Sequence, residues 1–166
     1  MVDHVTKTRR SAIMSAVHGK NTAPEILVRK AAHRLGLRFR LHRRSLPGQP
    51  DLVFPKWQTV VFVNGCFWHQ HPGCQRAILP KSKIRFWRRK FEQNVQRDIA
   101  NYARLAEMGW RVVILWQCQL GRPGTIERAT DLLRANFLSH RRKRPREFGI
   151  DRLPRPEAPS ETSRRS

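Results

Sequence analysis

Acidic residues are scarce in this 166-residue sequence, which has 12 Asp or Glu against 34 Lys or Arg. The net charge of +22 and the pI near 11.7 predict a strong positive field, and the usual partner of such a field is a polyanion. A basic tail on an otherwise ordinary domain is the alternative explanation. Residues 140–166 carry a net charge of only +5, so most of the charge belongs to the body of the chain and nucleic acid is favoured.

Long apolar runs and a secretory signal are also lacking. No stretch approaches the roughly 18 apolar residues of a membrane span, and the first ten residues hold no apolar segment. Only three cysteines are present, an odd number that argues against a disulfide framework and favours metal binding or a free thiol. We therefore expect a soluble, cytoplasmic protein that makes no contact with membranes.

The hydrophobic pattern predicts helices and strands in mixed order. Thr22, Pro24 and Glu25 give a capping-box signature for a helix that ends at Gly36. Strands are expected at 37–41, 51–54 and 59–63, a long helix from Ser82 to Gly109, a strand at 110–116 and a helix from 125 to 137. This order predicts an α/β or α+β domain with a mixed central sheet flanked by helices. We expect a mobile basic arm at 1–20, the folded domain at 21–139 and a disordered basic tail at 140–166.

Cysteine and histidine gather directly after the third expected strand. Cys66, His71 and Cys74 follow the spacing C-x4-H-x2-C, and Cys118 ends a later strand that could return it to the same place. Zinc takes four sulfur or nitrogen ligands in tetrahedral geometry, so these four residues predict a structural zinc site. The alternative is that the cysteines pack as small apolar residues, which accounts for Cys118 better than for the cluster in a Pro-Gly loop.

Two residues near this cluster suggest phosphodiester chemistry. Asp51 follows a proline at the mouth of a hairpin, where a carboxylate can bind Mg²⁺, although an aspartate in a turn is also common. His69 has a side chain suited to proton transfer near neutral pH. Asp51 and His69 in a basic body favour a nuclease.

Aromatic residues accompany the same segment. Phe67 and Trp68 follow Cys66, and Trp87 lies beside Phe86 among several Lys and Arg residues. They are either core residues or a wedge that enters between base pairs, where stacking contributes on the order of 1–3 kcal/mol per base. Packing against the core is the serious alternative for Phe67, and we expect either Phe86 or Trp87 to point inward.

From about Thr8 to Cys118 the sequence resembles the very short patch repair DNA mismatch endonucleases. The resemblance rests on residues 15–22, Leu46-Pro47-Gly48-Gln49-Pro50-Asp51-Leu52-Val53, Gly65-Cys66-Phe67-Trp68-His69, Phe86-Trp87 with Asn94 and Arg97-Asp98, and Gly109-Trp110-Arg111-Val112. It implies a restriction-endonuclease-like fold and a nick in one strand of duplex DNA, 5′ to the thymine of a T:G mismatch left by deamination of 5-methylcytosine. It also implies a bacterial, nucleoid-associated protein, and we expect a monomer that works beside other mismatch-repair proteins.

The resemblance also implies roles for individual residues. Asp51 and the backbone carbonyl of Val63 would bind Mg²⁺, His69 would assist hydrolysis, and Glu25 would contribute to the active site in addition to its place in the capping box. Phe67, Trp68 and Trp87 match intercalating aromatics, and Cys66, His71, Cys74 and Cys118 match zinc ligands.

One departure from the family concerns Asn64, because some members have a second active-site histidine directly before Gly65. An amide exchanges no proton near pH 7, so Asn64 is left to orient water or a phosphate oxygen. Two rival functions remain: a restriction-like endonuclease with another DNA substrate, and a zinc-braced DNA-binding protein without catalysis.

Overall fold

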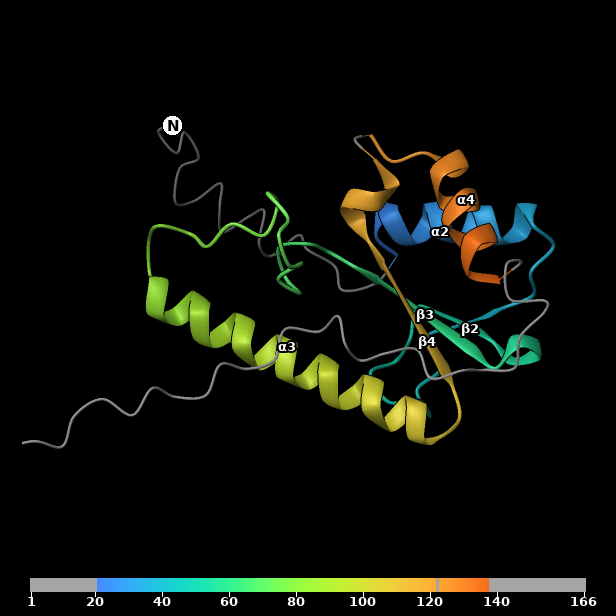
Figure 1. Ribbon diagram of the computed structural model, residues 1–166, viewed down its shortest axis with the longest axis horizontal. Coiled ribbons are helices and arrows are strands. Elements are labelled where there is room, and N and C mark those ends of the chain that lie inside the picture. Colours follow the sequence, from blue (N-terminus) through green and yellow to red (C-terminus); the bar gives the residue numbers. More distant parts are fainter. Residues whose placement is uncertain (1–20, 122, 138–166) are drawn as a thin grey trace, which may run out of the picture.

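The computed structural model describes residues 21–121 and 123–137 (Figure 1). Its elements, in chain order, are α2 (Ala23–Arg34), β1 (Arg40–Leu41), β2 (Leu52–Phe54), the 3-10 helix η1 (Pro55–Trp57), β3 (Thr59–Asn64), α3 (Ile84–Glu107), β4 (Arg111–Trp116), the 3-10 helix η2 (Gln117–Leu120) and α4 (Ile126–Phe137). The predicted arm at 1–20 and the predicted tail at 140–166 lie outside the described residues. Among the helices that are described, none combines the length and the apolar composition needed to cross a membrane.

The four strands form one mixed sheet in the order β1-β2-β3-β4. β1 and β2 are antiparallel, β2 and β3 are antiparallel, and β3 and β4 are parallel. β3 lies inside the sheet and nearly all its residues are buried, as its apolar composition on both faces predicts. The parallel pair ends with Asn64 opposite Trp116, so the segments that follow β3 and β4 leave the same edge of the sheet.

Helices cover both faces of the sheet (Figure 1). Alternate strand residues divide between two apolar clusters, because successive side chains of a strand point to opposite faces. α2 and α4 pack over one face around Leu52, Phe54 and Val61. α3 packs over the other face, where Leu105 meets Val53 and Val60. The predicted mixed sheet flanked by helices is confirmed.

Local sequence signals account for most of the element boundaries. Gly36 and Gly109 follow α2 and α3 with φ of +67° and +78°, the left-handed conformation that glycine adopts without strain. At the start of α4, the Arg128 amide donates to Thr125 Oγ1 over 3.2 Å. Two predictions were too generous. The strand expected at 37–41 pairs with β2 only over Arg40–Leu41, and α3 begins after Lys83 instead of being capped by Ser82.

Candidate active site and metal centre

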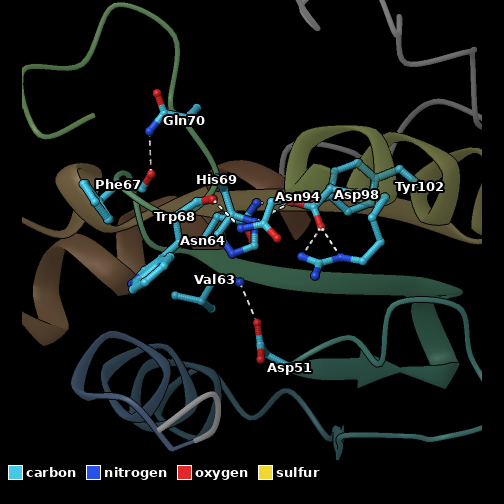
Figure 2. A network of polar contacts seen from close by, with 11 residues as sticks. Asp51, Val63, Asn64, Phe67, Trp68, His69, Gln70, Asn94, Asp98 and Tyr102 are labelled. Atoms are coloured by element: carbon cyan, nitrogen blue, oxygen red, sulfur yellow. Dashed lines mark hydrogen bonds and ion pairs between the residues drawn. The ribbon is translucent and has the colours of Figure 1, made fainter. Parts of the chain in front are cut away.

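The candidate active site surrounds the end of β3. Asp51 precedes β2 and lies across from β3, where its Oδ2 accepts the backbone N–H of Val63 over 2.7 Å. The antiparallel register of β2 and β3 brings the two residues together, with Leu52 opposite Val61. Within the described residues, Asp51 Oδ1 accepts no hydrogen bond. One oxygen of the carboxylate is therefore fixed and the other remains available to a ligand (Figure 2).

The electrostatic environment of Asp51 is that of a cation site. Burial raises the pKa of Asp51 to about 6 from an ordinary value of 3.8. The Val63 N–H opposes this shift, the negative charge of Glu25 adds to it, and the positive charge of Arg29, with that of His69 when it is protonated, lowers the pKa again. A desolvated carboxylate with a second acidic group near it gains from a bound divalent cation, which favours the charged form. The residues present therefore fit Mg²⁺, a hard cation that prefers oxygen ligands.

Glu25 is held on the α2 side of the site. Its carboxylate accepts the N–H of Asn21 and the N–H and hydroxyl of Thr22, at 2.9, 3.3 and 2.8 Å, so the predicted reach-back to the helix N-terminus is confirmed. Arg29, one turn further along the helix, forms an ion pair with it at 2.9 Å. Four donors engage the two oxygens and Glu25 is only 3% exposed. The side chain is thus fixed firmly, and it acts on Asp51 through its charge.

His69 lies on the other side of β3 and pairs with Asp98 of α3. The distance between His69 Nδ1 and Asp98 Oδ2 is 2.5 Å, and Arg97 donates to the second oxygen of Asp98 over 3.0 Å. An ionised carboxylate only accepts hydrogen bonds, so Nδ1 carries a proton and Nε2 of neutral His69 has a free lone pair. This arrangement suits a base whose ring is oriented by a carboxylate.

Three successive turns of α3 contact the last residue of β3 and the segment that follows it. Asn94 donates to the backbone carbonyl of Trp68 over 3.1 Å, Asp98 accepts from His69, and the hydroxyl of Tyr102 accepts the amide N–H of Asn64 over 3.0 Å. We call Asn94, Asp98 and Tyr102 the polar stripe of α3. Their spacing of four residues puts them on one helix face (Figure 2). Burial raises the pKa of the Tyr102 hydroxyl, which stays protonated.

The four predicted zinc ligands meet at the edge of the sheet where β3 and β4 end. One ligand atom from each of Cys66, His71, Cys74 and Cys118 lies within 4.8 Å of all the others. His71 Nδ1 is 3.8 Å from Cys66 Sγ and 3.2 Å from Cys118 Sγ. Ligand atoms of tetrahedral zinc are roughly 3.3–3.8 Å apart, given the usual bond lengths. A Cys/His cluster that could hold a metal ion is therefore present.

The surroundings of this cluster set the protonation states of its possible ligands. Burial lowers the pKa of His71, so its imidazole is neutral and has a lone pair to donate. Burial raises the pKa of Cys66 to about 12, so a bound cation is needed to make the thiolate the stable form. The His71 ring stacks on Trp116 with centroids 4.2 Å apart and an interplanar angle of 13°, which fixes its orientation.

Aromatic residues form a half-buried patch at the N-terminal end of α3. Phe67 packs against Trp68, Trp87 and Phe91, with ring centroids 5.2, 5.5 and 5.0 Å apart. Phe91 is buried beneath them, whereas Phe86 is 59% exposed. Trp87 therefore packs against Phe67 and Phe91 with part of its surface still exposed, whereas Phe86 points outward, which settles the choice left open by the sequence. Exposed cations surround the patch: Lys81, Lys83, Arg85, Arg88, Arg89 and Lys90.

The structure groups the predicted site residues into three neighbouring sets. Asp51, Glu25 and the backbone of Val63 form the carboxylate side, His69 and Asn64 face α3, and Phe67, Trp68 and Trp87 form the aromatic patch. Sequence reasoning assigned no role to the polar stripe of α3 or to Arg29. The spacing of Asn94, Asp98 and Tyr102 was the available signal, but Tyr102 fits an apolar helix face equally well.

Comparison with known proteins gives a consistent result. A family model described as DNA mismatch endonuclease Vsr matches residues 2–76. The chain is 50% identical over 127 residues to the Type II nicking enzyme V.XorIIP of Xanthomonas oryzae pv. oryzae, a match covering 76% of this chain and 93% of the relative. It is 41% identical over 120 residues to the DNA mismatch endonuclease Vsr of Escherichia coli, covering 72% of this chain and 76% of the relative. A nicking enzyme of Neisseria meningitidis, V.NmeAIP, is 42% identical over 120 residues, 72% of this chain and 85% of the relative.

Proposed function

Because the chain belongs to the Vsr family of DNA mismatch endonucleases, we propose that it nicks one strand of duplex DNA 5′ to the thymine of a T:G mismatch, with Mg²⁺ as catalytic cofactor. Family membership makes it a DNA endonuclease, a hydrolase, and the mixed sheet flanked by helices is the restriction-endonuclease-like fold of that family. The substrate, the ions and the roles of individual residues are the parts that we propose.

The observation that carries the proposal is the number of candidate functional groups that lie between Val63 and His69. Within seven residues, the chain supplies the backbone partner of Asp51, two half-buried aromatics and a histidine oriented by a carboxylate. A DNA-binding protein without catalysis needs only the aromatics and the basic surface. The paired Asp51 and His69 sites on opposite sides of β3 favour hydrolysis.

The chemistry divides between the two sides of β3. When bound at Asp51 and the Val63 carbonyl, Mg²⁺ would supply positive charge to the scissile phosphate and to the charge that develops there. Asp98 orients the His69 ring, and His69 Nε2 accepts a proton from the attacking water or returns one to the leaving oxygen. Glu25 and Arg29 set the charge around Asp51. Asn64 orients the water.

Selectivity for the mismatch is assigned to the aromatic patch. Phe67, Trp68 and Trp87 are held by contacts with one another and with Phe91, so little side-chain freedom is lost when they enter the base stack. A T:G pair costs less to unstack and bend than a matched pair, so insertion favours mismatched DNA. The cations along α3 contact phosphates and place the duplex without reading sequence.

Nicking of two duplexes that differ in one base tests this substrate. With identical flanks, we expect a T:G duplex to be nicked at least about a hundredfold faster than a T:A duplex, because a difference of a few kcal/mol in distortion energy separates them. Mg²⁺ is added without chelator and products are resolved by strand. Equal cutting of both duplexes would indicate a restriction-like endonuclease with another substrate.

Replacing Asp98 by asparagine is expected to slow nicking about 10- to 100-fold while the Kd for T:G duplex stays unchanged. The amide cannot stabilise the charged imidazole and does not fix the Nδ1–H tautomer of His69. Single-turnover rates and binding in Ca²⁺ separate the two quantities. Glu92→Gln, an exposed acid on α3, is the matched control and should nick at the wild-type rate. A wild-type rate for Asp98→Asn would remove Asp98 from the mechanism.

The remaining proposals concern the zinc, the domain and the assembly. We propose that Cys66, His71, Cys74 and Cys118 hold structural Zn²⁺, because four soft ligands close the coordination sphere and leave no position for substrate. We keep 21–139 as the endonuclease domain, and we propose that a monomer acts on the duplex, with other mismatch-repair proteins as partners.

A further inference from the structure

The mechanism above uses Asp98 of the polar stripe and gives no role to Tyr102, whose hydroxyl contacts Asn64. The stripe contacts the end of β3 and the segment after it: Tyr102 contacts Asn64, Asn94 holds the carbonyl of Trp68, and Asp98 holds His69. Because all three side chains project from one face of a continuous helix, they fix the aromatic patch, the base and Asn64 relative to one another (Figure 2).

Asn64 occupies a position where its orientation has consequences. It is the last residue of β3, directly after Val63, whose N–H fixes Asp51. The side chain is 5% exposed, and its Nδ2 donates to the Tyr102 hydroxyl over 3.0 Å. Within the described residues, Asn64 Oδ1 accepts no hydrogen bond, and it is not among the fully enclosed polar atoms that lack a partner. In the part of the chain that the structure describes, an amide oxygen without a hydrogen-bond donor is therefore left at the end of β3, directly after the residue that fixes Asp51.

We propose that Tyr102 is a positioning residue for nicking, and that it holds the Asn64 amide so that Asn64 Oδ1 accepts a hydrogen bond from the attacking water. This inference rests on the proposed hydrolysis at Asp51. Water offers two protons: one is directed to Asn64 Oδ1 and the other to His69 Nε2, which leaves an oxygen lone pair for the phosphorus. As the water oxygen bonds to phosphorus, His69 takes one proton and the P–O bond to the leaving oxygen breaks.

The alternative is that the hydrogen bond between Asn64 and Tyr102 only pairs two buried polar groups and has no part in catalysis. In that case, removing the hydroxyl would lower stability but would leave catalysis intact. The packing allows the two roles to be separated. The Tyr102 ring lies 5.0 Å from the Phe62 ring and adjoins the apolar cluster around Leu105, so phenylalanine keeps these contacts and loses only the hydroxyl.

A double-mutant cycle of Tyr102→Phe and Asn64→Ala, in the full chain with its metal, tests the proposal. We expect each single variant to reduce the single-turnover nicking rate about tenfold, with an unchanged Kd for duplex in Ca²⁺. The double variant should be no slower than Asn64→Ala alone, because the hydroxyl acts only through the amide. Thr130→Val removes a buried hydroxyl on α4 and should leave the rate unchanged.

Two outcomes would overturn the proposal. One is a Tyr102→Phe rate within twofold of the wild type, and the other is a double variant whose loss equals the product of the single losses. The cycle compares variants on whichever duplex the wild type nicks, so a mistaken substrate leaves its result readable. Loss of nicking by the wild type on every duplex would instead count against the proposed function.

Discussion

Asp51→Asn is expected to abolish Mg²⁺-dependent nicking, with a loss of at least about a thousandfold in rate. In the proposed mechanism the carboxylate is the hard oxygen donor that would hold the cation at the scissile phosphate, and a neutral amide binds Mg²⁺ far more weakly. If the Asp51→Asn variant nicks at the wild-type rate in Mg²⁺, the active site lies elsewhere. Asp131→Asn, an exposed acid on α4, is the control with the same chemical change.

The same substitution should stabilise the Mg²⁺-free protein above about pH 6. In the folded state the pKa of Asp51 is about 6, above its ordinary value of 3.8. The folded protein therefore binds the Asp51 proton more tightly than the unfolded chain does, and this contribution to stability is full below pH 4 and lost as the pH rises through 6. Asparagine removes the cost of the buried charge, so we expect the free energy of unfolding to rise by about 2–3 kcal/mol at neutral pH.

Thermal unfolding at pH 4 and pH 7.5, with zinc retained and neither Mg²⁺ nor chelator added, measures this effect. The gain of Asp51→Asn over the wild type should be present at pH 7.5 and absent at pH 4. Added Mg²⁺ should raise the Tm of the wild type and not that of the variant, because only the wild type binds the ion. A variant that is less stable than the wild type at pH 7.5 would show that the Asp51 charge is well solvated.

Loss of the metal from the Cys/His cluster is the second large effect. We expect one equivalent of zinc per chain, and we expect His71→Asn to remove it, to lower the Tm by more than about 10 °C and to eliminate nicking. The cluster joins the segment after β3 to the segment after β4. The segment after β3 also carries His69 and two residues of the aromatic patch, Phe67 and Trp68. The Trp116 ring stacked on His71 gives a fluorescence signal for the same event.

His69→Asn provides a matched control two residues away. Both variants replace a histidine of the same segment by asparagine, but His69 is outside the four-residue cluster. The His69→Asn variant should keep its zinc and its Tm while losing nicking. The two variants therefore separate the structural role of the metal cluster from the catalytic role of His69. A native protein without bound metal, or a His71→Asn protein of unchanged Tm, would contradict the zinc assignment.

Features that depend on neighbouring residues were predictable from the sequence. The capping contacts of Glu25, the end of α3 at Gly109 and the central position of β3 all follow from local pattern, and all are present. The meeting of Cys118 with Cys66 and His71 was also anticipated from its place at the end of a later strand, and the parallel pairing of β3 and β4 is what brings it there. That inference depended on composition: three cysteines and a histidine complete one zinc site.

Contacts between distant residues were not predictable in the same way. The partners of the polar stripe lie 26, 29 and 38 positions away along the chain. A spacing of four shows that Asn94, Asp98 and Tyr102 share a helix face, but the sequence does not say which strand that face meets. Its spacing from Phe91, Val95 and Leu105 also suits Tyr102 to the apolar face of α3, and its ring does pack against Phe62. The contact between the Tyr102 hydroxyl and Asn64 becomes visible only when the end of β3 is placed against α3.

The parallel pairing of β3 and β4 has a consequence for how the chain acquires its native state. His71 and Cys118 are 47 residues apart in sequence, and α3 lies between them. Three of the cluster residues precede α3, whereas the fourth is supplied only after β4 has docked beside β3. Closing so long a loop is slow compared with forming a hairpin. A tightly held metal ion is therefore expected late in folding, and its uptake would report that the chain has reached its correct topology.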